Sequence, residues 1–409
     1  MKRKAVFPYI AGQTFAVIGV WMHLTMLSTL ALRLTESALW LGVTLAAYSL
    51  PTLLFSWFVG ALLNRWRVKT MLLWIQALQA VIMMAYALLL ALDRMAPGPL
   101  MTLALLSGIL YTVDLPGRQL MLTRLFGNER VMQAIALNSV AFNGARIVGP
   151  LLAGLFLVSP DLSWGFAVNG LLFTAAFGCL LLVESPAESD GTQAGAGPEP
   201  ETAARLQPRI WKVLLLVFVS GLLLMNYNTL LPMFAAEQGD SGSGYSRLLA
   251  SMGVGSLAAA VMITFRSSWF RHNFLIPLFP ALIAVAYAVL PSLPRGLPTL
   301  LLLAIYGFFL TGFITMSNAA VLREGSKRDR AKLASVFNML LNGFVPLGNM
   351  LTGIFLHYLG VSGSFYLISG STLLFLVVWL AYSRLKGGGD VHVRYRQSPE
   401  ARPHHTRER

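Results

Sequence analysis

Three charged residues stand inside apolar segments of this sequence. Asp114 and Arg118 belong to "DLPGRQLMLTRLF", and Arg146 belongs to "AIALNSVAFNGARIVGPLLAGL". A charge at the centre of a membrane helix costs about 2.5–3.5 kcal/mol, so it persists where it is paired, faces water or has a function. The chemistry open to these residues is proton transfer at the carboxylate and anion binding at a guanidinium.

Asp114 has two interpretations. Arg118 lies four residues further along the same helix face, and an ion pair there would staple a gate near the helix end. Alternatively, Asp114 carries a proton, because burial and a nearby cation act in opposite directions on its protonation. At 1.5 Å per residue, Asp114 lies about 12 Å and Arg146 about 20 Å from the helix ends on the same side of the membrane. A long Arg side chain can bridge this difference in depth. We assign Asp114, Arg118 and Arg146 to proton coupling.

Arg146 has interpretations of its own. Inside a cavity it would attract an anionic group of a substrate, or hold Asp114 ionised until a substrate displaces it. The structural alternative is that Arg146 caps backbone carbonyls that Pro150 leaves without an N–H donor.

The elements that position these charges are apolar helices. Hydrophobic residues make up 56% of the 409 residues and charged residues 12%, which exceeds the apolar content of a soluble globular chain. Apolar runs of about 20 residues are long enough to cross about 30 Å of hydrocarbon, and their continuity excludes alternating barrel strands. We predict an all-α membrane protein with twelve spans: 7–33, 38–62, 69–92, 99–122, 133–158, 162–184, 210–235, 246–266, 272–291, 297–320, 333–357 and 361–384.

The basic residues that give the net charge of +14 are distributed unevenly between the two sides of the predicted spans. Of the 31 Lys and Arg residues, 26 fall on one side of the predicted spans. By the positive-inside rule this side is the cytoplasm, and it holds both termini. The basic start "MKRK" precedes a run long enough to span, so we expect no cleavable signal peptide. The charge therefore indicates no nucleic-acid partner, and the partner we expect is the lipid bilayer.

The chain divides into two halves. A segment rich in Pro, Gly, Ala and Glu separates six runs from six, and it reads as a flexible cytoplasmic linker. A shift of 199 residues, without a gap, aligns "NGARIVGPLLAGLF" with "NGFVPLGNMLTGIF", which indicates an internal repeat. We predict an N-terminal six-helix bundle over 1–184, a linker over 185–209, a C-terminal bundle over 210–385 and a disordered basic tail over 386–409.

The two halves with their linker resemble the major facilitator superfamily. "GALLNRWRVK" resembles its motif between helices 2 and 3, with Gly60, Arg65 and Lys69 in place and Asn64 where the motif has Asp. "GQTFAVIGVWM", "LTESALWLGVTLAAYSLPTLLF" and "DLPGRQ", together with the Arg146 segment, look like the branch that contains the enterobactin exporter and related siderophore and drug efflux proteins. The resemblance implies the major facilitator fold, a monomer in the bacterial inner membrane, and proton-driven export.

Other residues gain a meaning from this resemblance. Gly149, Pro150 and Gly154 loosely resemble the Gly-Pro stretch associated with antiporters, although small residues also serve close helix packing. The first helix of each half lines the central cavity in the superfamily, so we expect substrate contacts from polar residues there and from similar ones in the fifth span. Hydrogen bonding between neighbouring helices is the alternative for all of them. The residues are His23, Asn138, Asn143 and the "NYN" of Asn226, Tyr227 and Asn228.

Several classes of function lack their signatures. The sequence contains no Gly-rich phosphate loop followed by Lys and Ser or Thr, no Cys/His cluster with metal-ligand spacing and no acidic pair placed for hydrolysis. We therefore expect no enzyme, no cofactor and no metal, and an ion gradient as energy source. The predicted function is proton-coupled export of a siderophore or an amphipathic drug. A lysophospholipid or lipid translocator of the same fold and a membrane sensor that transports nothing are the alternatives.

Overall fold

The computed structural model describes residues 3–126, 131–159, 161–183, 208–240, 242–266, 272, 274–324 and 330–385, and it is helical there apart from short connections. The predicted tail and all but the last two residues of the predicted linker lie outside these ranges. The elements are α1 (Arg3–Thr35), α2 (Ala38–Arg65), α3 (Val68–Ala91), α4 (Pro97–Phe126), α5 (Val131–Leu157), α6 (Ser163–Leu181), α7 (Pro208–Leu223), α8 (Tyr227–Glu237), α9 (Ser243–Phe265), α10 (Leu275–Val289), the short 3-10 helix η3 (Leu290–Ser292), α11 (Leu297–Glu324), α12 (Arg330–Asn342) and α13 (Val345–Leu385).

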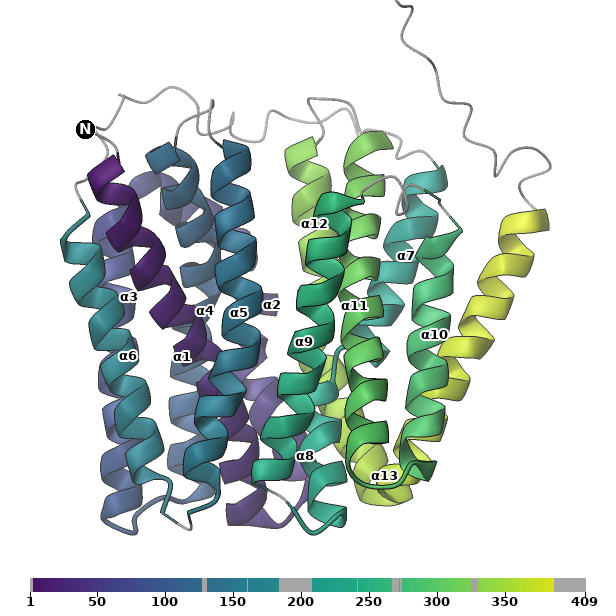
Figure 1. Ribbon diagram of the computed structural model, residues 1–409, viewed down its shortest axis with the longest axis horizontal. Coiled ribbons are helices and arrows are strands. Elements are labelled where there is room, and N and C mark those ends of the chain that lie inside the picture. Colours follow the sequence, from purple (N-terminus) through teal and green to yellow (C-terminus); the bar gives the residue numbers. More distant parts are fainter. Residues whose placement is uncertain are drawn as a thin grey trace, which may run out of the picture.

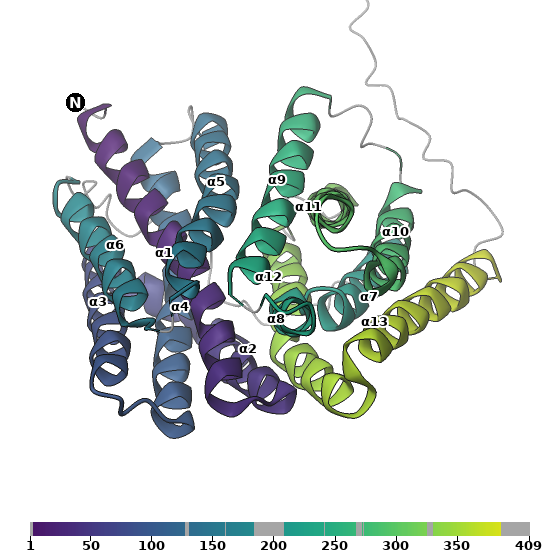
Figure 2. The same ribbon diagram turned by 60° about the horizontal axis from the view of Figure 1, so that its bottom comes forward.

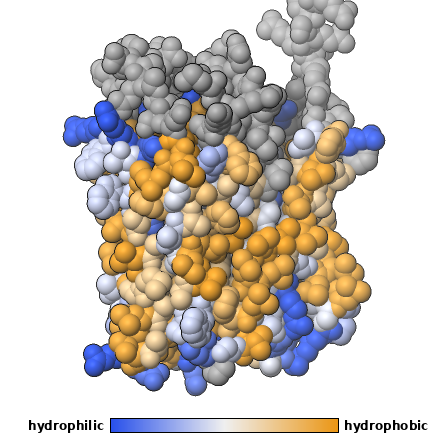
Figure 3. Space-filling view, turned by 60° about the vertical axis from the view of Figure 1, so that its left-hand side comes forward, coloured by the Kyte–Doolittle hydropathy of each residue, from blue (hydrophilic) through white to orange (hydrophobic). Residues whose placement is uncertain are grey.

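The chain is a multi-pass membrane protein by the length and composition of its helices. Within the described residues, ten helical segments are long and apolar enough to cross a membrane, and a shorter apolar helix covers Ala141–Leu157. Figure 3 shows apolar side chains in a broad band around the middle of the molecule, with hydrophilic ones gathered toward its two ends. The ends of the described chain, at the start of α1 and the end of α13, lie on the same side (Figure 1).

The last two predicted spans form one long element with a sharp bend. Val336–Ser383 is one continuous candidate of 48 residues, and Gly360 interrupts its helical geometry with φ 67° and ψ −176°. Only glycine adopts such a backbone conformation readily, because it has no Cβ. Figure 1 shows α13 turning back on itself on the side of the molecule opposite the start of α1. The gap between the predicted spans 333–357 and 361–384 marks this bend.

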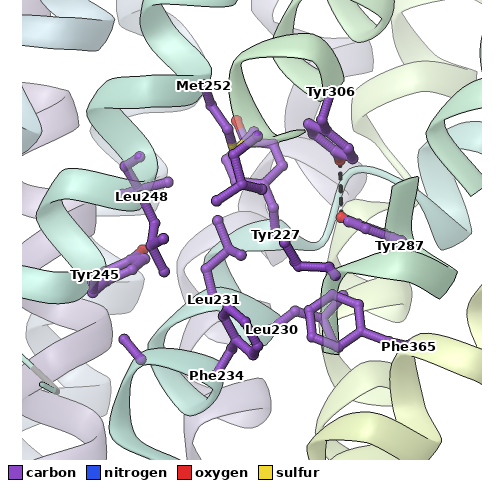
Figure 4. Packing of buried hydrophobic residues seen from close by; sticks show 14 of the residues in the cluster. Tyr227, Leu230, Leu231, Phe234, Tyr245, Leu248, Met252, Tyr287, Tyr306 and Phe365 are labelled. Atoms are coloured by element: carbon purple, nitrogen blue, oxygen red, sulfur yellow. Dashed lines mark hydrogen bonds between the residues drawn. The ribbon is translucent and has the colours of Figure 1, made fainter. Parts of the chain in front are cut away.

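The predicted span 210–235 is a broken helix. α7 ends at Leu223 and α8 begins at Tyr227. At the break, the hydroxyls of Tyr287 (3.2 Å) and Tyr306 lie within hydrogen-bond distance of the carbonyl of Leu224 and 2.9 Å from each other (Figure 4). Each hydroxyl has one proton, so at least one of them donates to the carbonyl while the other donates to it or to its neighbour. Buried carbonyls need partners, and these two tyrosines from α10 and α11 supply them where the helix does not.

The helices form two groups, α1 to α6 and α7 to α13, which lie beside each other in both views (Figures 1 and 2). Between the groups α5 packs on α9, α2 on α13 and α1 on α8. One buried apolar cluster contains residues of both groups, among them Trp21, Ala145, Tyr227 and Met252.

Glycines 199 residues apart make equivalent contacts in the two groups. A Cβ on Gly108 would lie 1.9 Å from the carbonyl oxygen of Tyr48, and one on Gly307 would lie 2.0 Å from that of Met252. These are the α4 to α2 and the α11 to α9 contacts, the same helix pair in each half of the predicted repeat. Backbones can approach so closely only where a side chain is missing.

The contacts between the groups follow the same rule. Gly154 of α5 packs on Ser246 of α9, where a Cβ would meet the serine Cβ at 2.9 Å. Its repeat partner Gly353 of α13 packs on α2, with the Cα of Gly42 at 3.0 Å from such a Cβ. Gly42 lies one turn from the start of α2 and Gly154 one turn from the end of α5, so both contacts lie toward the membrane side opposite the termini.

Candidate functional site

Asp114 and Arg118 form a buried ion pair on α4. The Nε of Arg118 lies 2.7 Å from Oδ2 of Asp114, and the side chains are 8% and 9% exposed. Gln76 of α3 donates from Nε2 to the other carboxylate oxygen, Oδ1, at 2.9 Å. Both oxygens of the carboxylate therefore accept a hydrogen bond, as a buried charge requires. This is the pairing that the spacing of four residues predicted.

The pair belongs to the first group of helices. Tyr9 of α1 donates its hydroxyl to the backbone carbonyl of Arg118 at 2.6 Å, which ties α1 to α4 at this level. The residues around the carboxylate thus come from α1, α3 and α4. Arg146 makes no contact with Asp114 in the described structure, so the Asp114–Arg146 pair that the sequence left possible is not formed.

Arg146 lies instead at the junction of the two groups. From α5 its Nη1 donates to Ser256 Oγ of α9 at 3.3 Å, and its Nη2 donates to the hydroxyl of Tyr227, the first residue of α8, at 3.4 Å. The guanidinium carbon lies 4.7 Å from the centre of the Trp21 ring of α1. Among the described residues it has no carboxylate partner.

The surroundings of Arg146 argue against the capping alternative. Its side chain reaches α8 and α9 rather than the carbonyls around Pro150. A small cavity, with about 10 Å³ open to the centre of a water molecule, adjoins it. Figure 4 shows two residues of its wall, Tyr227 and Met252, within the buried apolar cluster. The residues that line the cavity are Trp21, Arg146, Pro150, Tyr227, Leu249 and Met252.

The glycines of α5 determine how closely the neighbouring helices approach it at this junction. A Cβ on Gly149 would meet the Trp21 Cβ at 2.6 Å and the carbonyl oxygen of Ile18 at 2.9 Å. Its absence lets α1 approach α5, which brings the Trp21 ring over Arg146 one turn away. Gly144, by contrast, has no heavy atom near the place of a Cβ. The structure thus gives Gly149 and Gly154 packing contacts, on α1 and on α9.

His23 lies away from this junction. Its ring packs against Tyr48, Tyr86 and Phe166, with ring centres 5.7, 5.5 and 6.3 Å away. These partners belong to α2, α3 and α6, and His23 is 2% exposed. The location inside the first group agrees with the packing alternative that the sequence left open.

The candidate asparagines are dispersed. Asn226 is fully buried at the break between α7 and α8, where its Nδ2 donates to the carbonyl of Leu222 at 2.5 Å. Asn228 accepts a hydrogen bond from the hydroxyl of Tyr245 at 3.3 Å, and this hydroxyl also lies 3.5 Å from Ser28 Oγ of α1. Asn143 is buried in α5, and the side chain of Asn138 lies outside the described residues.

The motif between α2 and α3 is described in part. Lys69 donates from Nζ to the carbonyls of Val183 at 2.5 Å and Leu181 at 3.4 Å, so it caps the end of α6 within the same group. Arg65 is exposed at the end of α2. The surroundings of Gly60 and the side chain of Asn64 are not among those that the structure describes.

Three residues of these sites were missing from the sequence-based candidates: Gln76, Trp21 and Ser256. Gln76 carries a signal, since it and Gln79 are polar residues within the predicted span 69–92. Trp21 carries none, because one aromatic residue in an apolar run looks like any other. Tyr227 was a candidate, together with the two asparagines beside it in "NYN".

The model of the Major Facilitator Superfamily matches residues 9–342 of this chain. The chain belongs to this superfamily. Membership identifies this Major Facilitator protein as a transporter rather than an enzyme. A curated relative, the staphyloferrin A transporter of Staphylococcus aureus (strain NCTC 8325 / PS 47), is 23% identical over an alignment of 402 positions that covers 92% of this chain and 96% of the relative. The uncharacterized MFS-type transporter YfiS of Bacillus subtilis (strain 168) is 24% identical over 204 residues, 49% of this chain and 47% of YfiS.

Solved structures of other transporters share the fold. A POT family transporter in complex with a thioalcohol-conjugated peptide superposes with a TM-score of 0.76 at 11% identity, covering 92% of this chain and 96% of its own. A D-xylose–proton symporter has a TM-score of 0.73 at 14% identity, with 92% and 97% covered. The nucleoside transporter NupG has a TM-score of 0.70 at 15% identity, with 93% and 99% covered. At these identities the likeness shows the fold alone.

Proposed function

We propose that this protein is a secondary transporter that exports a small organic anion, a siderophore first and an amphipathic drug second, by alternating access. The observation that carries the proposal is the position of Arg146. It is an intramembrane cation between the two groups of helices, and it has no carboxylate partner among the described residues.

The two hydrogen bonds of Arg146 leave N–H donors of its guanidinium for an anion to bind. A guanidinium has five N–H donors, and the two hydrogen bonds at 3.3 and 3.4 Å exceed the usual 2.7–3.2 Å. Desolvating a cation costs several kcal/mol unless an opposite charge compensates. A carboxylate, catecholate or hydroxamate oxygen on the substrate would supply that charge and accept short, parallel hydrogen bonds.

The siderophore assignment has two supports. The sequence resembles the enterobactin exporter branch of the superfamily through its first half, and the printed name of the S. aureus relative is that of a staphyloferrin A transporter. A lysophospholipid also carries an anionic phosphate, so a lipid translocator is the second candidate. A membrane sensor that transports nothing is the candidate from another class.

Proton coupling is proposed at Asp114. Protonation of this carboxyl would remove the charge that holds Arg118, so the α4 contacts on that side of the membrane would loosen. Arg146 takes part in the proposed coupling through its positive charge, which an anionic substrate neutralises on binding. The polar residues proposed to line the cavity are Asn138, Asn143, Asn226 and Asn228. The gate and motif positions are Gly60, Asn64, Arg65, Lys69, Gly149, Pro150 and Gly154.

The topology belongs to the same proposal. We infer twelve crossings, with α7 and α8 forming one crossing and α13 contributing to two through the bend at Gly360. Both termini lie in the cytoplasm of a bacterial cell, the protein works as a monomer in the inner membrane, and the two bundles span 1–184 and 210–385. The partners are a small-molecule substrate, protons and lipid.

Transport by purified protein in proteoliposomes tests the proposal. With an imposed proton gradient, wild-type protein is expected to move an anionic siderophore, and an uncharged analogue of similar size about tenfold less, given that a desolvated charged hydrogen bond is worth about 1.5–3 kcal/mol. Arg146→Gln is expected to lose about tenfold or more in affinity. Arg146→Lys should keep attraction and lose selectivity for planar anions, because Lys lacks the rigid fork.

Arg94→Gln is the matched control, since Arg94 is an exposed residue between α3 and α4. Equal transport by Arg146→Gln and wild type would remove Arg146 from the substrate site. Transport of a fluorescent lysophospholipid but of no siderophore would favour the lipid translocator. Absence of flux for siderophores, drugs and lysolipids would favour the sensor. Asp114→Asn exporting as fast as wild type under the gradient would exclude Asp114 as the proton carrier.

A further inference from the structure

We infer that a small cavity beside the Asp114–Arg118 pair binds a single water molecule, which connects the pair to the membrane side on which α1 begins. The cavity has about 10 Å³ open to the centre of a water molecule and lies between α1, α3, α4 and α6. Tyr9, Gln76, Arg118, Ala176 and Leu180 contribute to its wall. None of the residues lining it lines the cavity at Arg146.

The hydrogen bonding of Gln76 calls for a donor. This side chain belongs to a residue that is 1% exposed, and its Nε2 donates to Asp114. Its Oε1 is buried and accepts no hydrogen bond from the described residues. Leaving a buried acceptor without a partner costs about 1–3 kcal/mol. A water in the adjoining cavity would donate to this oxygen.

Arg118 supplies the second partner. Its Nε bonds to Asp114, and the described structure gives its two terminal nitrogens no acceptor. A water accepts from such a nitrogen while it donates to Gln76. Buried waters need two to four polar partners and a cavity of about 10–15 Å³ on this measure. The cavity meets both conditions for one water and is too small for a larger ligand.

The cavity lies near the membrane surface, so the path by which its water exchanges with the solvent is short. Tyr9 is six residues from the start of α1, and Leu180 is one residue from the end of α6. At 1.5 Å per residue, Tyr9 lies about 9 Å from the end of its helix, and Gln76 and Arg118, which hold the water, lie about 12 Å from the ends of theirs. In the proposed topology this side is the cytoplasm. The water would hydrate the Asp114–Arg118 pair from within the first group of helices, apart from the cavity at Arg146. The water site stands on geometry alone and does not depend on the proposed proton coupling.

Hydroxyl-radical footprinting by X-ray radiolysis of water tests the site, because bound waters label the side chains that they touch. Tyr9 is 2% exposed, and Tyr86 and Tyr245 are fully buried controls that do not line the cavity. In purified full-length protein we expect Tyr9 to be labelled about fivefold faster than Tyr86 and Tyr245, since water reaches only the polar cavity. Equal slow labelling of the three tyrosines would overturn the proposal.

A filling substitution sharpens the test. Ala176→Val places two methyl groups at the cavity wall without removing a hydrogen bond of the ion pair, and it should lower Tyr9 labelling severalfold. Ala104→Val, at an equally buried alanine that does not line the cavity, should leave it unchanged. Gln76→Met, which lacks the acceptor, should also lower it and serves if Ala176→Val fails to fold. Wild-type labelling of Tyr9 in both folded variants would overturn the water site. Labelling needs no substrate, so the failure of transport and the failure of this proposal are distinguishable.

Discussion

The guanidinium of Arg146 lies over the ring of Trp21, 4.7 Å from its centre, although the two residues belong to helices α5 and α1. The ring faces the cation on one side, while Tyr227 and Ser256 accept its hydrogen bonds from the other group of helices. Arg146 is therefore held by weak, neutral partners. An anion that enters this junction competes with the hydroxyls of Tyr227 and Ser256 for the guanidinium N–H groups, rather than with a carboxylate, while the Trp21 ring stays over the cation.

Replacing Trp21 should weaken binding of an anionic substrate. A cation–π contact is worth about 0.5–2 kcal/mol, so Trp21→Leu is expected to raise the Kd by up to about thirtyfold. Trp21→Phe keeps a ring and should lose less. Binding of the siderophore to detergent-solubilised protein, followed by calorimetry, measures both. Wild-type affinity in Trp21→Leu would show that the ring does not assist Arg146.

Adding a methyl group at Gly42 should destabilise the contact between α2 and α13. A Cβ there would lie 2.6 Å from the carbonyl oxygen of Asn349 and 2.9 Å from the Cα of Gly353, and backbone atoms cannot move aside cheaply. Gly42→Ala is expected to cost about 1–3 kcal/mol of stability, seen as a lower Tm.

Gly178→Ala is the control for this prediction, because no heavy atom lies within 4 Å of a Cβ there. It should be neutral or stabilising by up to about 1 kcal/mol, since Ala favours a helix over Gly. A Gly42→Ala protein as stable as Gly178→Ala would contradict the close contact.

The two tyrosines at the break between α7 and α8 should show coupled effects. Either hydroxyl of Tyr287 or Tyr306 can serve the carbonyl of Leu224, so each single Phe variant should cost only about 0.5–1.5 kcal/mol. The double variant leaves the buried carbonyl without a donor and should cost more than the sum. Thermal unfolding of the four proteins measures this coupling, and strict additivity would argue against a shared acceptor.

Asp240 should make the start of α9 sensitive to acid. Burial raises the pKa of Asp240, but hydrogen bonds from Ser243 and the Gly244 N–H, together with the charge of Arg247, outweigh it and hold the pKa below its usual range. A lowered pKa stabilises the folded state above the ordinary carboxyl value of about 3.9, and this contribution disappears as the pH falls through the lowered value. The Tm difference between wild type and Asp240→Ala should be constant above about pH 5 and shrink below about pH 4. A difference that grows with acidity would reverse the sign.

The sequence predicted the contacts that depend on local spacing. Asp114 and Arg118 are one helical turn apart, so their pairing needed no knowledge of other helices. Gly360 lies between two apolar runs, and its role as a bend follows from that gap. The shift of 199 residues also pointed to Gly154 and Gly353, whose packing contacts are equivalent in the structure.

Contacts between distant helices could not be predicted in this way. Arg146 lies 125 residues from Trp21 and 81 from Tyr227 in the chain, and its partners depend on how closely α5 approaches α1 and α9. The break after Leu223 has no glycine or proline at its centre that would signal it in the sequence. The tyrosines that stabilise the break come from α10 and α11 instead. His23 looked equally suitable for a cavity or for packing, and only the position of three aromatic rings distinguishes the two.

The packing glycines occur in pairs, but the charges do not. A shift of 199 residues takes Asp114, Arg118 and Arg146 to Phe313, Ser317 and Val345. The first half thus contributes Asp114, Arg118 and Arg146, and the second half contributes neutral partners of Arg146. A substitution at Tyr227 in α8 or Ser256 in α9 therefore changes the surroundings of Arg146 without altering the Asp114–Arg118 pair.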